Sequence, residues 1–192
     1  NYSNIQLRDS RVDVGTKYEY FDYDNVLVMP EVALNTRSEG LISYYLNAQF
    51  ESFDRHYSPT KGISVRGSYA LYTTNFVTNH GHTPFSVVSI DFLSAISLSS
   101  RVALLPGRYG RVLIGDNFAF PTLNIVGGTV GGRYLPQQIP FVGIHHFEKF
   151  DNAVVGATFD FRVRLWKKNY VSLKTQYARQ DNNFFDLLDG RD

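Results

Sequence analysis

The stretch from residue 41 to residue 72 carries two runs in which apolar and polar residues alternate, and this pattern constrains the fold most strongly. Apolar residues recur at every second position from Ile42 to Phe50 and again from Ile63 to Leu71. Successive side chains of a strand point to opposite faces, so a period of two over about ten residues predicts a strand. Pro59 and Gly62 mark a turn between the runs. The stretch therefore predicts a long β-hairpin with one apolar, aromatic face and one small, polar or charged face.

Similar alternation recurs along most of the chain, and no long helix is needed to explain any segment. Residues 10–21 show it most cleanly, whereas the division between 86–95 and 97–105 is weakly marked. Short Gly-, Asn- or Pro-containing segments separate the runs, as expected for turns and loops. About eight or nine strands are expected. The predicted strands are 10–21, 26–35, 41–51, 62–72, 86–95, 97–105, 111–114, 154–166 and 170–178, with a further strand or plug segment near 125–134.

The length of these strands favours a membrane protein. A tilted strand of about ten residues crosses a bilayer. Lipid-facing and lumen-facing residues alternate in such a strand, which agrees with a mean hydropathy of -0.22 despite 15% aromatic residues. The sequence contains no stretch of about twenty apolar residues, so no transmembrane helix is predicted. We predict an antiparallel transmembrane β-barrel formed by a single domain, 1–192, that is part of a larger barrel. A soluble barrel or sandwich with its apolar face turned inward is the alternative.

Charged residues on the polar faces separate these two interpretations. In the core of a soluble sandwich, each unpaired charge would cost several kcal/mol. In a barrel lumen the same groups are hydrated or paired with one another, so they favour the membrane barrel. The charges predicted to face the lumen include Arg66, Asp160, Arg162 and Arg164, together with Lys17, Glu19, Glu51 and Lys174.

Composition excludes several classes of function. The net charge of +1 gives no basic footprint for nucleic acid. The absence of cysteine excludes a disulfide scaffold, a thiolate nucleophile and a cysteine-ligated metal. Neighbouring His145 and His146 would point apart on extended backbone, so neither a metal site nor any cofactor is predicted. No G-x-S-x-G motif occurs, and we expect no hydrolase activity from this chain alone.

The turn of the hairpin resembles a known family. FDRHYSPTKGISVRGSY, residues 53–69, is similar to a periplasmic turn of the bacterial surface-antigen barrels, which include outer-membrane assembly factors and two-partner secretion transporters. IVGGTVGGRYLPQQIPFVGI, residues 125–144, resembles their Gly-Gly segment and inward-folded loop, and DFRVRL resembles one of their strands. The matching turn residues are Phe53, Asp54, Arg55, Pro59, Thr60, Lys61 and Gly62.

Within that superfamily, the phrase from Gly127 to Gly143 is most similar to the carboxy-terminal barrel of outer-membrane patatin-like phospholipases. The resemblance implies a long Gly/Pro-rich loop, about 115–150, folded toward the lumen, and two further strands after Asp192. For Arg133, the alternative to a contact with the lumen is an ordinary solvent-exposed position. The residues expected to contact the lumen from this loop are Gly127, Gly128, Gly131, Gly132, Arg133 and Tyr134.

The order Gly132, Arg133, Tyr134 departs from the Arg-Gly-aromatic tip of the assembly factors. Around 174–176 the chain also lacks the acidic residue that holds that arginine, so no transporter-like lock is predicted.

The resemblance also implies a location and partners. It predicts a barrel in the bacterial outer membrane that serves as anchor and export route for a patatin-like phospholipase. The catalytic domain of that enzyme is expected outside this chain, and the expected role is in lipid metabolism. The expected partners are outer-membrane lipid, the barrel-assembly machinery during insertion, and further copies of the chain. Open alternatives are a protein assembly or secretion pore, a small standalone porin-like barrel, and a soluble lipid- or ligand-binding β-barrel. Because the chain begins at Asn1 without a secretion signal and ends in LLDGRD, it reads as a piece of a longer protein.

Overall fold

A computed structural model describes residues 2–7, 9–22, 39–55, 58–73, 84–116, 118–128, 138–141, 149–166, 169–182 and 184. Within them, the long strands form one eight-stranded sheet in the order β1-β2-β3-β4-β5-β6-β10-β11. These strands are β1 (Tyr2–Leu7), β2 (Ser10–Phe21), β3 (Glu39–Glu51), β4 (Gly62–Thr73), β5 (Phe85–Ser97), β6 (Val102–Ile114), β10 (Ala153–Arg164) and β11 (Tyr170–Asp181).

The connection between β6 and β10 carries the remaining elements. A short 3-10 helix η1 (Phe120–Thr122) precedes a small sheet made of β7 (Asn124–Val126), β8 (Gln138–Ile139) and β9 (Lys149–Asp151). β7 is central, parallel to β8 and antiparallel to β9.

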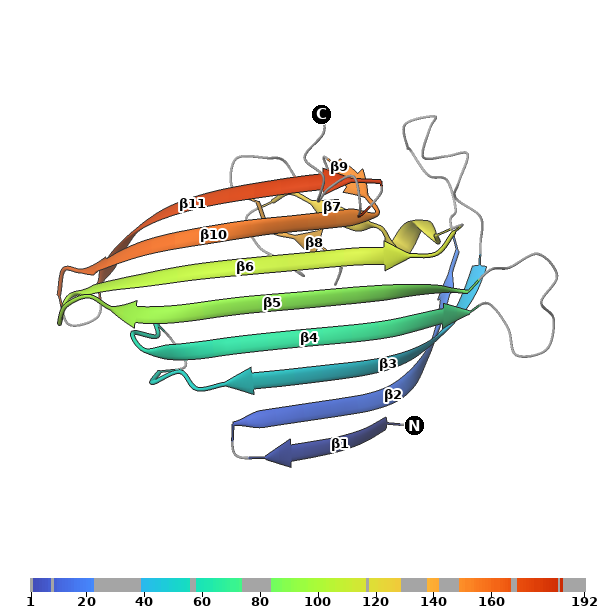
Figure 1. The fold of residues 1–192 in the computed structure, drawn as a ribbon, viewed down its shortest axis with the longest axis horizontal. Coiled ribbons are helices and arrows are strands. Elements are labelled where there is room, and N and C mark those ends of the chain that lie inside the picture. The colour runs from blue at the N-terminus through green and yellow to red at the C-terminus, as the bar shows by residue number, and fades with distance from the viewer. Residues whose placement is uncertain are drawn as a thin grey trace.

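Every neighbouring pair of long strands is antiparallel. Figure 1 shows these strands as one curved sheet, with β1 and β11 at its edges. In the described part of the chain no pairing joins those two edges. The all-β antiparallel fold predicted from the alternation is therefore confirmed, and the described strands form an open curved sheet.

The two faces of this sheet differ in chemistry. We call the inner face the one that lines a cavity of about 1060 Å³, to which β2, β3, β4, β5, β6, β10 and β11 all contribute. The opposite, outer face carries the large apolar side chains that remain exposed. Representative exposed residues, one each from β2, β3, β4, β5, β6, β10 and β11, are Tyr18, Leu46, Tyr69, Ile90, Ile114, Phe159 and Leu173. An outer apolar face against a polar interior is the arrangement of a barrel in lipid, and it is opposite to that of a soluble barrel.

The two ends of the sheet also differ. Short connections join β1 to β2, β3 to β4, β5 to β6 and β10 to β11 at one end, while the longer connections 22–38, 74–84 and 115–152 lie at the other. Outer-membrane barrels have short periplasmic turns and long extracellular loops. We therefore assign the short-turn end to the periplasmic side.

Several strand boundaries differ from those predicted. The turn between β5 and β6 lies at 98–101, inside the segment predicted as a strand over 97–105, and residues 102–105 and 111–114 belong to the single strand β6. Pro106 and Gly107 interrupt the alternating pattern, yet the pairing of Pro106 with Phe159 and of Gly107 with Thr158 carries the strand through. β1 was not predicted, and the predicted strand 26–35 lies outside the described residues.

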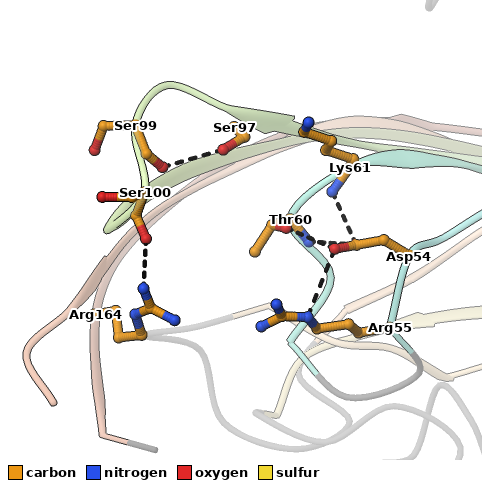
Figure 2. Close-up of polar contacts among 8 residues, drawn as sticks. All are labelled: Asp54, Arg55, Thr60, Lys61, Ser97, Ser99, Ser100 and Arg164. Carbon is orange, nitrogen blue, oxygen red and sulfur yellow. Dashed lines mark hydrogen bonds and ion pairs between the residues drawn. The ribbon is translucent and has the colours of Figure 1, made fainter. Parts of the chain in front are cut away.

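The turn between β3 and β4 is built around one carboxylate (Figure 2). Asp54 Oδ1 accepts hydrogen bonds from the backbone N–H groups of Thr60 at 2.8 Å and Lys61 at 2.9 Å. Its Oδ2 accepts one from the Thr60 hydroxyl at 2.7 Å and lies 3.7 Å from Arg55 Nε. The Asp, Arg, Thr and Lys of the sequence motif therefore close this turn.

Gly62 opens β4 with a φ of +111°, and a Cβ there would overlap the carbonyl oxygen of Ser52. We expect Gly62→Ala to lower the free energy of unfolding by about 1–3 kcal/mol, because an L-residue is strained in this backbone region. Urea unfolding in lipid vesicles measures this change in the free energy of unfolding. Gly67→Ala is the matched control, because a Cβ at Gly67 would have its nearest neighbour, Ser89 O, at 4.0 Å. Equal stability of the two variants would contradict the strain.

Partial desolvation raises the pKa of Asp54, but the Thr60 hydroxyl, the two N–H groups and Arg55 outweigh it and lower the pKa from 3.8 to about 2. A folded-state pKa below the unfolded one stabilises the fold above about pH 4, and this stabilisation is lost as the pH falls toward 2.

We therefore expect Asp54→Asn to cost about 1 kcal/mol of unfolding free energy at pH 7 and less at pH 2.5. Urea unfolding of both proteins at the two pH values measures it. A difference between wild type and variant that stays constant between the two pH values would refute the role of the charged carboxylate.

Candidate functional site

The cavity on the inner face is the candidate site. Its walls carry hydroxyl, amide and charged side chains from strands across the whole sheet. Several charges pair with a neighbour two positions away on the same strand: Arg11 with Asp13 at 2.8 Å, Lys17 with Glu19 at 2.6 Å, and Arg162 with Asp160 at 2.9 Å. Residues two apart on a strand share a face, so these pairs all belong to the interior. The arrangement provides a polar surface on which several charges are paired.

The segment 118–128 covers the inner face near the extracellular end of the sheet. Ala119 is buried with Leu41, Phe85, Val87 and Leu113, which come from β3, β5 and β6. The ring of Phe85 stacks on Tyr72 with centroids 5.0 Å apart and meets the edge of Phe118 at 5.5 Å. An apolar contact thus holds the connection between β6 and β10 against the inside of the sheet.

A polar contact fixes the same segment beside the apolar one. Arg111 of β6 donates to the backbone oxygen of Thr122 at 2.8 Å and to the side-chain oxygen of Asn124. Asn124 is fully buried and its amide donates back to the Arg111 backbone oxygen at 3.2 Å. A buried guanidinium needs several acceptors, and these come from the connecting segment. Arg111 and Asn124 therefore join the wall of the cavity to the segment that lies over it.

Gly127 and Gly128 continue from β7 and are both buried. Their φ values of +139° and +79° are strained for other residues. The Gly127 N–H donates to Ile139 O at 3.0 Å, and its oxygen accepts from the Gln138 side chain at 2.8 Å. Gly127 therefore adjoins β8, whose residues Gln138 and Ile139 line the cavity, and Gly128 forms an isolated antiparallel bridge with Phe141. Gly131, Gly132, Arg133 and Tyr134 lie outside the described residues, and so do His145, His146 and Glu148.

The predicted lumen charges occupy three kinds of position. Arg66 is 61% exposed, lines the cavity and lies 4.0 Å from Glu51. Asp160 and Arg162 are paired and mostly buried, at 14% and 16% exposure. Arg164 is at the periplasmic end, where it donates to the Ser100 backbone oxygen at 2.7 Å, and Figure 2 shows it beside that turn. Arg164 therefore links two strand ends.

Sequence reasoning missed Arg111, Asn124 and the contact between Tyr109 and Gly156. These two residues are paired across β6 and β10, and a Cβ on Gly156 would overlap the Tyr109 ring. Had 102–114 been read as one strand, Tyr109 and Arg111 would have fallen on the polar face. No sequence signal marks Asn124 as their neighbour.

The described residues contain no group of three or more His, Cys, Asp or Glu residues that could hold a metal ion. They also contain no helix that is long and apolar enough to cross a membrane.

Comparison with known proteins agrees with this architecture. A family model for the OMP85 superfamily matches residues 4–190, which include nearly all of the eight-stranded sheet and the segment over its inner face. No curated protein matches the chain. Proteins of this superfamily lie in the outer membrane, so the bacterial outer membrane is the location of this one. The chain belongs to the OMP85 superfamily and is an outer-membrane β-barrel of the assembly or secretion type.

Proposed function

We propose that this barrel anchors a patatin-like phospholipase domain in the outer membrane and provides its export route. The observation that carries the route is the polar cavity, whose wall spans β2 to β11 and is partly covered by the segment 118–128. The similarity of residues 127–143 to the barrels of patatin-like phospholipases supports the choice of passenger.

In this proposal the barrel carries no catalytic step. A patatin-type hydrolase attacks its ester with a serine on a G-x-S-x-G elbow, which this chain lacks. The passenger supplies that chemistry. The barrel's own residues hold the protein in lipid with the outer face and offer a hydrated surface with the inner one.

A protein assembly or secretion pore without an enzymatic passenger is the second candidate. The same polar wall favours it, since a polypeptide in transit needs a wide hydrated passage. The two candidates differ in whether a hydrolase domain belongs to the same native protein.

Intact mass and peptide mapping of the native protein from outer membranes test the passenger. We expect a chain much heavier than 21.9 kDa with a G-x-S-x-G serine outside residues 1–192. Replacing that serine with alanine should abolish phospholipase activity while leaving the barrel folded in the membrane. A native protein without such a domain would exclude the anchor function and leave the pore.

Weakening the contacts that hold the segment 118–128 over the cavity should widen the proposed passage. We expect Asn124→Ala to increase single-channel conductance or its open time in planar bilayers several-fold, because Arg111 loses an acceptor from the segment over the cavity. Asn47→Ala is the matched control, since Asn47 lines the same cavity and is exposed. Identical conductance of both variants and wild type would argue against a gating role for the segment.

A further inference from the structure

Arg108 borders both the inner cavity and a groove on the outer face, and its side chain points to the outer face, where the neighbouring strands present apolar or small side chains. It is the central residue of β6, and its register partners are Phe92 on β5 and Ala157 on β10. Gly107 points inward, since a Cβ there would meet the Thr158 hydroxyl on the inner face, whereas one on Gly110 would meet Val155 and Ile90 on the outer face. Strand alternation then directs Arg108 outward with Gly110.

No other outward position on the described parts of β2 to β6 and β10 is charged. The outward residues of these strands are Val, Ile, Leu, Phe and Tyr, with small or hydroxyl residues between them. On β11 the outward Arg179 and Asp181 belong to the last residues of the strand. Arg108 therefore places a single cation halfway along a strand that crosses the membrane, where a charge facing lipid is costly.

The surface around Arg108 is hollowed. A groove of about 770 Å³ runs over β5, β6 and the adjoining part of β10, and its lining includes Ile90, Phe92, Ile96, Pro106, Arg108 and Val155. Gly110 and Ser94 leave space between the larger apolar side chains. The groove is thus apolar along its length, with one guanidinium in it.

Among the described residues, none forms a hydrogen bond or ion pair with the Arg108 side chain. A guanidinium has five N–H donors and keeps its charge at any physiological pH. In lipid no water satisfies those donors. The N–H donors of Arg108 are therefore satisfied only when an occupant of the groove supplies an anionic hydrogen-bond acceptor.

We propose that this groove binds one lipid with an anionic head group, whose acidic oxygens pair with Arg108 and whose acyl chain lies along the apolar lining. Charge complementarity and shape both favour this occupant. The volume falls within the about 300–1,000 Å³ typical of small-molecule sites. A protein partner would instead need a broad contact of about 800 Å² on each side. The proposal does not depend on the passenger domain.

Lipid retention measured by native mass spectrometry tests this site. The full protein is released from micelles that contain equal amounts of phosphatidylglycerol and phosphatidylcholine. We expect wild type to retain one phosphatidylglycerol in preference to phosphatidylcholine. Arg108→Leu should retain it at least about tenfold less, because the charge-assisted hydrogen bonds are lost. Arg108→Lys, which keeps the charge without the planar fork, should fall between them.

Arg66→Gln is the matched control, because it removes a cation from the inner face. It should retain phosphatidylglycerol as wild type does. Equal retention by wild type and Arg108→Leu, or equal loss in Arg66→Gln, overturns the proposal. Arg108→Leu should fold, since leucine matches the surrounding face, and urea unfolding of the same sample verifies this.

A photoreactive residue in place of Ser94 identifies the occupant in cells. Cross-linking to lipid supports the proposal. Cross-linking to an acidic segment of another protein, or to a second copy of this chain, overturns it.

Discussion

Backbone hydrogen bonding in lipid is the constraint on which this structure depends. Inside a bilayer no water can satisfy a free N–H or C=O group, so strands must pair along their whole length. The register from β1 to β6 and on through β10 to β11 gives every strand from β2 to β10 of this sheet a neighbour on both sides, and β1 and β11 are the edges of the described sheet. It also explains why Pro106 and the glycines of β6 do not end that strand: β10 pairs with Pro106, Gly107 and Gly110, and β5 pairs with both of these glycines.

Continuous pairing in turn fixes the polarity of the two faces. Once each strand is held in register, its alternate residues must all point to the same side. Apolar side chains then form the lipid-facing surface, and hydroxyls, amides and paired charges form the cavity wall. Ion pairs within single strands, such as Lys17 with Glu19, reduce the cost of holding charge in this interior. The proposed export route depends on this inversion, because only a hydrated interior can serve as a passage.

Two different forces hold the segment 118–128 against the inner face of the sheet. The aromatic cluster around Phe85 provides apolar contact area. The hydrogen bonds from Arg111 to Thr122 and Asn124 fix the position of the segment on the wall. Apolar contact alone tolerates sliding, whereas the fork of a guanidinium requires its acceptors at fixed positions. The combination gives the segment a defined place on the wall and a small set of contacts whose loss would release it.

The sequence by itself determined the strands with clean alternation, β2, β3, β4, β10 and β11, and the inner or outer face of their side chains, because a period of two is a local property of a strand. It also marked the Asp54 turn, whose hydrogen bonds join residues only six or seven positions apart. Only the tertiary structure decided that β6 is continuous and that Asn124 meets Arg111. It also showed that Arg108 stands alone in an apolar groove. These features depend on neighbours brought together by strand pairing and chain reversal, and no local pattern records such distances.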